Sequence, residues 1–188
     1  SSDVCSSDLG WLEGFEVGAR IGMGELYEPL TGLTIGGNAT LIDSQVQVAQ
    51  EDLDRFELAG VTADLSKRDM TGAPNYLYNV YATVGLEDTG TNIGLFYTAQ
   101  GETLLSGAGI NGNFDFIPSI YAKPVGTLNF TVTQRLFENF QVFFKAKNLT
   151  NPDIRTVYRS PSGSYEATRS TYTSGIDLSL GITASFDF

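Results

Sequence analysis

The closing stretch GIDLSLGITASFDF, residues 175–188, decides the fold. From Ile176 onward every second residue is apolar, and the residues between them are Asp, Ser, Gly or Thr. Because side chains on a β-strand alternate between two faces, one face of this stretch is apolar and the other is polar or small. A tilted strand of about 9–11 residues crosses a bilayer. The stretch is therefore predicted to be a membrane-crossing strand that ends with the chain.

Six further stretches show the same two-residue alternation, which makes seven predicted strands. The polar faces of these stretches are interrupted by Leu77, Tyr81, Phe96 and Phe143, and one apolar face is interrupted by Gln134. No stretch shows a convincing helical period. The seven predicted strands cover residues 15–23, 33–41, 76–86, 93–99, 128–135, 140–147 and 176–188.

The connections between these strands alternate strictly in length. Short turns lie at ELYEPLTG, EDTGTN and LFEN, whereas long polar links begin near Gln47, Ser106 and Thr150. In an up-and-down antiparallel sheet this alternation places all short turns at one end and all long loops at the other. Bacterial outer-membrane barrels have short periplasmic turns and longer external loops. The sequence therefore predicts an all-β fold, an antiparallel up-and-down transmembrane β-barrel of which residues 10–188 form about seven strands.

The composition and charge of the chain make several classes of partner and function unexpected. The chain has 188 residues, of which 22 are acidic and 11 basic, for a formal charge of −11. Nucleic-acid binders need a basic face, so nucleic acid is not expected as a partner, and acidic substrates are equally disfavoured. There is no run of eighteen apolar residues, so no transmembrane helix is predicted. Residues 1–9 contain the lone Cys5 within SSDVCSSDL, which resembles a translated sequencing adapter; we interpret them as a leader foreign to the protein.

Beyond Cys5 the chain contains neither cysteine nor histidine. This removes the thiolate nucleophile, the Ser-His-Asp triad and the usual zinc sites, so we expect neither an enzyme nor a bound cofactor. The segment GAGING, residues 107–112, fits G-x-G-x-x-G, but Pro118 follows and no helix is available to bind pyrophosphate, so a loop is expected. The acidic run Glu51, Asp52, Asp54 and Glu57 lacks the spacing of a calcium loop and is interpreted as a solvated external loop.

A resemblance to a known family rests on three segments. TLNFTVTQRLFENFQVFFKAKNLTNP (127–152), the closing strand and GLTIGGNATLIDSQV (32–46) resemble the C-terminal barrel portion of TonB-dependent outer-membrane receptors. The most specific parts are the strand exit KNLTNP and the terminal aromatic strand. The resemblance implies a plugged barrel of roughly 22 strands in the outer membrane of a Gram-negative bacterium. It also implies that the plug, and the segment that engages an inner-membrane energy-transducing partner, lie upstream of residue 10.

The function implied by this resemblance is energised uptake of a scarce solute such as an iron chelate, a cobalamin-like cofactor or an oligosaccharide. The strands would form the barrel wall against outer-membrane lipid. The family also carries a C-terminal recognition pattern for the barrel-assembly machinery, and here it falls two residues upstream of its usual place, with an extra aromatic at the end. The matching residues are Ser179, Gly181, Ala184 and Phe186, and Phe188 is the extra terminal aromatic of this candidate assembly signal.

Polar residues that share the non-lipid side of their strands are predicted to face the lumen. A lysine or arginine at the lipid midplane would cost about 2–4 kcal/mol, so the charged members must face inward or lie near an interface. We expect them mainly to solvate the lumen or to bond the plug. Tyr76, Tyr97, Phe140 and Phe186 are interpreted as an interfacial aromatic girdle. The lumen-facing candidates are Glu16, Arg20, Asn79, Gln100, Arg135, Gln141, Lys145 and Lys147.

Two other architectures fit parts of the pattern. A small standalone barrel or porin would need an even number of strands, at least eight, against the seven counted. A soluble β-sandwich binding module would bury the apolar faces between two sheets. Seven strands alone would leave two open edges in lipid, so residues 10–188 by themselves are expected to aggregate rather than insert stably.

Overall fold

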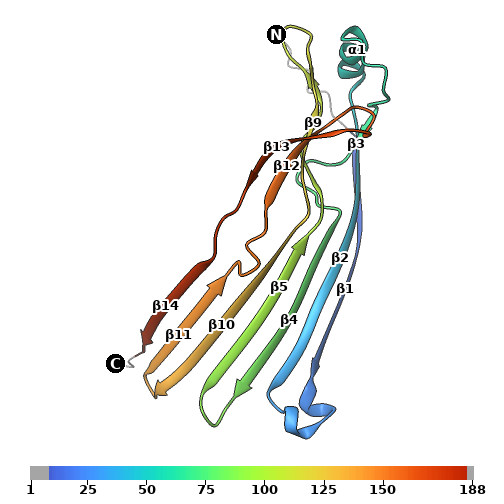
Figure 1. The fold of residues 1–188 in the computed structure, drawn as a ribbon. Coiled ribbons are helices and arrows are strands. Elements are labelled where there is room, and N and C mark those ends of the chain that lie inside the picture. The colour runs from blue at the N-terminus through green and yellow to red at the C-terminus, as the bar shows by residue number, and fades with distance from the viewer. Residues whose placement is uncertain (1–8, 186–188) are drawn as a thin grey trace.

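The computed structural model describes residues 9–185, and its main feature is a long antiparallel sheet (Figure 1). Seven long strands pair in chain order, and every pair is antiparallel. The expected all-β antiparallel class is confirmed, and each predicted strand is present. The strands are β1 (Gly10–Gly22), β2 (Leu33–Gln47), β4 (Tyr76–Leu86), β5 (Thr91–Gln100), β10 (Val125–Phe137), β11 (Phe140–Lys147) and β14 (Asp177–Ala184).

The pairing register keeps like residues on one face across all seven strands. Directly paired residues of an antiparallel sheet point to the same side. One row of such partners is wholly apolar, and a row three residues away on the other side is polar or glycine across the first five strands. The apolar row is Ile21, Ile35, Ala82, Leu95, Phe130, Ala146 and Leu178. The polar row is Gly18, Asn38, Asn79, Thr98 and Thr127.

Short and long connections lie at opposite ends of this sheet, as the sequence predicted (Figure 1). At the turn end, two 3-10 turns, η1 (Met23–Glu25) and η2 (Glu28–Leu30), join β1 to β2, and tight turns close the next two hairpins. At the loop end, the three links carry further structure. The second and third links form a second, four-stranded sheet in the order β13-β12-β9-β6, with bounds β6 (Thr103–Ser106), β9 (Ser119–Ala122), β12 (Ile154–Arg159) and β13 (Glu166–Tyr172).

The remaining loop-end elements are short. β3 (Lys67–Arg68) pairs with the end of β2, and β7 (Gly109–Ile110) pairs with β8 (Phe116–Ile117). This last hairpin contains the second half of the GAGING segment, so Gly109 and Ile110 lie in a short strand rather than in the expected loop, and a strand rather than a helix follows the motif, as expected.

One helix, α1 (Gln50–Leu58), was not expected from the sequence. It holds the acidic run that was interpreted as a solvated loop. The sequence shows no helical period of apolar residues here because Phe56 is the only buried residue of the helix. The Phe56 ring packs edge-on against Phe116, with the ring centroids 6.0 Å apart. The acidic side chains are exposed as expected, and Glu51 pairs with Arg55 one turn away at 2.9 Å. Tertiary contact, rather than an amphipathic stripe, holds this helix in place.

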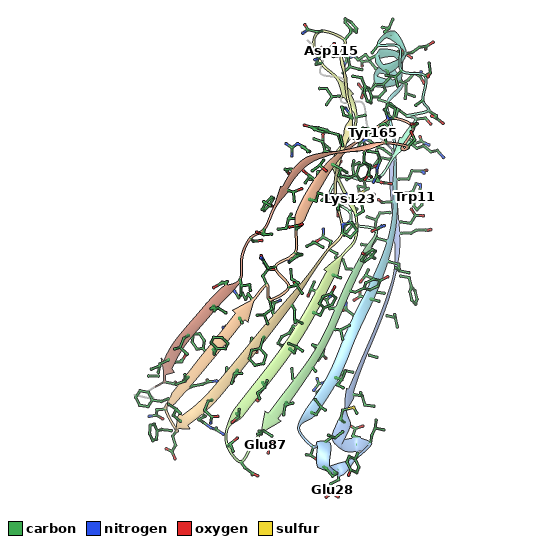
Figure 2. All side chains as sticks on the ribbon, viewed as in Figure 1. Trp11, Glu28, Glu87, Asp115, Lys123 and Tyr165 are labelled. Atoms are coloured by element: carbon green, nitrogen blue, oxygen red, sulfur yellow. The ribbon has the colours of Figure 1, made fainter. Side chains whose placement is uncertain are left out.

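The seven-stranded sheet is a single layer with both faces uncovered over most of its area (Figure 2). Its apolar side exposes large side chains, with Val80 54% and Leu180 76% exposed. Buried apolar residues gather instead at the loop end, where Leu104, Tyr121 and Val157 form a small core. Within residues 9–185 no second sheet covers the apolar side, which is not the packing of a β-sandwich.

The sheet is open in the described residues. β1 and β14 each pair with one neighbour only, so no closed barrel is formed by residues 9–185. Because each neighbour reverses direction, the first and seventh strands run the same way. Closing these seven strands on themselves would require a parallel pair.

Candidate functional site

We call the two sides of the seven-stranded sheet the apolar face, which contains the row from Ile21 to Leu178, and the polar face opposite it. All eight candidates for lumen-facing positions lie on the polar face by strand register. Whether this face surrounds a lumen stays a prediction. The eight are Glu16, Arg20, Asn79, Gln100, Arg135, Gln141, Lys145 and Lys147.

Hydrogen bonds join several of these residues to neighbouring strands. Asn38 Nδ2 donates to Glu16 Oε1 at 3.1 Å, and Thr98 Oγ1 donates to Asn79 Oδ1 at 2.9 Å. Gln100 Nε2 donates to Thr103 Oγ1 at 3.2 Å, where the main sheet meets the loop-end sheet. The polar face is thus a surface of amides and hydroxyls that can bond a polar occupant.

The four cations of the polar face lie toward the two opposite edges of the sheet. Arg20 is on β1, whereas Arg135, Lys145 and Lys147 are on the paired strands β10 and β11. Arg135 lies opposite Gln141, and Lys147 lies opposite Asp177 of β14.

Aromatic residues that interrupted the polar pattern lie over glycines. A Cβ added at Gly36 would come 2.5 Å from the Tyr81 hydroxyl, and one added at Gly94 would come 2.6 Å from the Phe96 ring. Phe143 similarly fills the space above Gly181. Glycine in the neighbouring strand, or for Phe96 in its own strand, therefore leaves room for each ring, which explains how the polar face accommodates large apolar groups. The Tyr81 and Phe96 rings also stack, with centroids 6.2 Å apart.

The assembly-signal candidates lie on β14 as far as the structure describes them. Ser179 is on the polar face opposite Lys145, and Gly181 lies under Phe143. Ala184 pairs with Phe140 at the turn end. Phe186 and Phe188 lie outside the described residues, as do residues 1–8 of the leader interpretation. Leu9 is described, and its carbonyl accepts a hydrogen bond from the Gln47 amide at 2.8 Å.

A cluster of four charges at the loop end was missed by sequence reasoning. Lys123 Nζ lies 2.7 Å from Glu102 Oε2 and 3.2 Å from Glu166 Oε2. Arg159 Nη2 lies 2.7 Å from Glu102 Oε1 and 2.5 Å from Glu166 Oε1. Each cation therefore bridges both carboxylates, and the four side chains are only 21–28% exposed. The cluster ties β12 and β13 to the segments that leave β5 and enter β10 (Lys123 is labelled in Figure 2).

Hydrogen bonds and ion pairs within this cluster shift the pKa values of its members. Burial opposes the charged form of Glu102, but hydrogen bonds from Arg159 and Lys123 outweigh it and hold the pKa of Glu102 below its usual range. The Arg159 hydrogen bond likewise lowers the pKa of Glu166. The Glu102 hydrogen bond raises the pKa of Lys123. All four groups are charged at neutral pH.

The lowered pKa values of Glu102 and Glu166 give the loop-end sheet an acid sensitivity. A carboxyl with a lowered folded-state pKa contributes stability above its unfolded pKa, about 4.3, and that stability is lost as pH falls through the folded value. We therefore expect hydrogen exchange of β12 and β13 amides to be slow at pH 7 and, after correction for intrinsic rates, to lose protection below about pH 4. In Arg159→Met, protection should already be reduced at pH 7. Equal protection at both pH values in the unaltered chain would contradict the assignment.

A hollow of about 200 Å³ lies beside this cluster. Tyr121 forms part of its wall, with the Arg159 guanidinium 3.8 Å from the ring centroid. The Tyr121 hydroxyl donates to Asp69 Oδ2 at 3.2 Å, and burial raises the pKa of that hydroxyl. Lys67 and Arg68 also line the hollow. All three long links contribute to it, so it is a partly polar recess at the loop end.

Across residues 9–185 there is no group of three or more His, Cys, Asp or Glu side chains arranged to hold a metal ion. In the same residues, no helix has the length and apolar character needed to span a membrane.

Comparison with known proteins identified no relative. No protein-family model matches the chain, and neither the curated proteins nor the solved structures contain a match. The features of the chain that bear on function are therefore the two faces of the sheet and the loop end.

Proposed function

We propose that these strands form part of the wall of a transmembrane antiparallel β-barrel in a bacterial outer membrane. The supporting observation is the uncovered apolar face, which runs across seven paired strands without a charged residue between its limits. Monomeric soluble proteins rarely expose apolar patches larger than a few hundred Å². Lipid is the solvent in which such a face, backed by a polar one, is stable.

The height of the apolar face agrees with this proposal. On β4 it runs from Tyr76 to Leu86, ten residue steps, or about 33 Å at the usual rise of about 3.3 Å per residue. Tilt shortens this span across the membrane, and the apolar band of outer-membrane barrels is about 25 Å tall. Glu13 and Asp43 lie directly opposite each other on the same face just beyond Leu41. They limit the apolar band toward the loop end.

Aromatic side chains flank the band. Trp11 and Tyr76 lie toward the loop end, and Phe137 and Phe140 meet edge-to-face near the turn end with centroids 6.4 Å apart. Aromatic girdles occupy both interfaces of such barrels. By the rule of short periplasmic turns and longer external loops, the loop end faces outward.

Within this proposal the protein is a receptor of the TonB-dependent class that takes up a scarce solute. The structured loop end, with its recess and charge cluster, would capture the solute, and the strands would form the passive wall. Closure needs an odd number of further strands, because all-antiparallel barrels have even strand numbers. The proposed receptor also requires a plug and an inner-membrane energy-transducing partner. The barrel-assembly machinery would insert the barrel into the outer membrane.

Paired cysteine variants test the membrane placement. Leu95→Cys on the apolar face and Thr98→Cys on the polar face of β5 would each be labelled with bimane in a Cys5→Ser background, in outer-membrane vesicles. We expect bimane at position 95 to emit at shorter wavelength and to be quenched by brominated lipid, with no quenching at position 98. Quenching at neither position, with the protein in the soluble fraction, would refute the barrel. Uptake that persists without an energised inner membrane would refute the receptor class and leave a passive porin.

A further inference from the structure

Charge is segregated in this molecule. The chain has 11 basic and 22 acidic residues, yet within the described part of the seven-stranded sheet the polar face holds four cations and two carboxylates. The other described carboxylates lie in the turns, in the loop-end structure or at the limit of the apolar face. The polar-face cations are Arg20, Arg135, Lys145 and Lys147, and the carboxylates are Glu16 and Asp177.

The polar-face cations differ from those at the loop end in their partners. Among the described residues, none of the four forms an ion pair, whereas Lys123 and Arg159 each bridge two carboxylates. Asp177 lies opposite Lys147 and offsets part of its charge. Glu16 accepts a hydrogen bond from Asn38. The positive charge of Arg20, Arg135 and Lys145 is thus not compensated by a carboxylate of the described sheet.

Three of these cations form a line along β10 and β11. Arg135 lies opposite Gln141, and Lys145 and Lys147 follow at four and six residues from Gln141 on the same face of β11. At about 3.3 Å per residue the line is about 20 Å long and runs from the turn end toward the loop end. The Lys145 ammonium lies 4.8 Å from the centroid of the Phe143 ring, which holds it close to the middle of this line. We call Arg135, Lys145 and Lys147 the basic stripe.

We infer that the basic stripe makes the polar face selective for small solutes with net negative charge, such as those bearing carboxylate or phosphate groups. The inference rests on the proposed function, in which this face lines the barrel lumen and meets water beside the plug. Narrow passages with low-dielectric walls focus the field of one sign of charge and raise the local concentration of the opposite ion. Among the solute classes of the proposed receptor, the stripe therefore favours an anionic chelate over an uncharged oligosaccharide. The net charge of −11 had disfavoured acidic substrates, but net charge carries no information on where the cations lie.

The reaction rates of charged thiol reagents with cysteines on this face report its electrostatic potential. Thr131 lies directly opposite Lys145, and Thr83 lies in the same cross-strand row, two strands away on β4. Thr131→Cys and its matched control Thr83→Cys would react with an anionic (ethylsulfonate) or a cationic (ethyltrimethylammonium) methanethiosulfonate, in the full-length protein in membranes. Rates are normalised to those of a free thiol. Ser179→Cys, also opposite Lys145, is the second probe if Thr131→Cys fails to fold.

At Thr131→Cys we expect about a tenfold preference for the anionic reagent, from two or three cations within about a Debye length. The preference should be at most about twofold at Thr83→Cys, and Lys145→Gln should reduce it at position 131 to about threefold. Inorganic pyrophosphate should slow the anionic reaction at position 131 in the presence of Lys145 and not in Lys145→Gln.

Each other outcome overturns the inference. Equal reagent preference at positions 131 and 83 would refute the stripe while leaving the lumen intact. Protection of position 131 from both reagents, with position 83 reactive, would show an acidic protein segment on the stripe instead of a solute. Failure of both reagents at both positions would show that the polar face does not meet water, which refutes the proposed function and the inference with it.

Discussion

Replacing Val80 with arginine is expected to prevent stable insertion of the protein into the membrane. Val80 lies on the apolar face of β4 and is 54% exposed in the absence of lipid. In water a substitution at such an exposed strand position changes stability by about 0.5 kcal/mol or less. On the lipid face of a barrel an arginine costs about 2–4 kcal/mol near the bilayer midplane. The size of the effect therefore distinguishes a membrane wall from a soluble sheet.

The matched control is Thr83→Arg, three residues along the same strand and on the polar face. The free energy of unfolding in outer-membrane vesicles, followed by urea titration and by loss of the heat-resistant band on gels, measures both variants. We expect Thr83→Arg to retain the unaltered protein's midpoint and Val80→Arg to be largely absent from the membrane fraction. Equal and small effects of the two variants would exclude lipid contact at Val80.

Gly32→Ala is expected to destabilise the turn end by about 2–3 kcal/mol, from a left-handed backbone and a lost hydrogen bond. Gly32 has a φ of +91°, and a Cβ there would collide with the carbonyl oxygen of Gly85. The Gly85 amide donates to the Gly32 carbonyl at 2.9 Å. Because the obstacle is backbone, a rotamer change cannot relieve the contact. The Gly85 segment would have to move away, which breaks the register of β2 with β4.

Gly60→Ala provides the comparison for backbone conformation alone. Gly60 also has a positive φ, +76°, but nothing lies within 4 Å of an added Cβ. Unfolding free energies of both variants should therefore differ, with Gly60→Ala losing only the left-handed cost of about 1–2 kcal/mol. If the two substitutions cost the same, the close approach of Gly32 and Gly85 does not contribute.

The alternation of apolar and polar residues predicted the strands reliably, because it depends only on residues that are neighbours along the chain. The closing strand, the six others and the order of short and long connections were all readable without contacts. Even the interruptions were informative, since Tyr81, Phe96 and Phe143 fall on the polar face as their parity requires. The sequence did not show how these rings fit on the polar face, because the space for them comes from glycines of the same or neighbouring strands, at Gly36, Gly94 and Gly181.

The loop end shows where sequence reasoning stopped. Glu102 and Arg159 are 57 residues apart in the chain, and no local pattern links them. Helix α1 was invisible for a similar reason, since Phe56 is buried by Phe116, a residue from another loop. The short strands β6 and β9 were not separated from the links that contain them, because elements of four residues carry too few alternations to stand out.

The sequence by itself determined the seven strands, their two faces and the end at which each connection lies, because strand alternation and connection length are set by neighbours along the chain. Only the tertiary structure decided the rest. It assembled the four-charge cluster from distant links, placed rings over glycines and aligned Arg135, Lys145 and Lys147 on one side of the polar face. These features depend on which residues of different strands face each other, and that register exists only once the strands have paired.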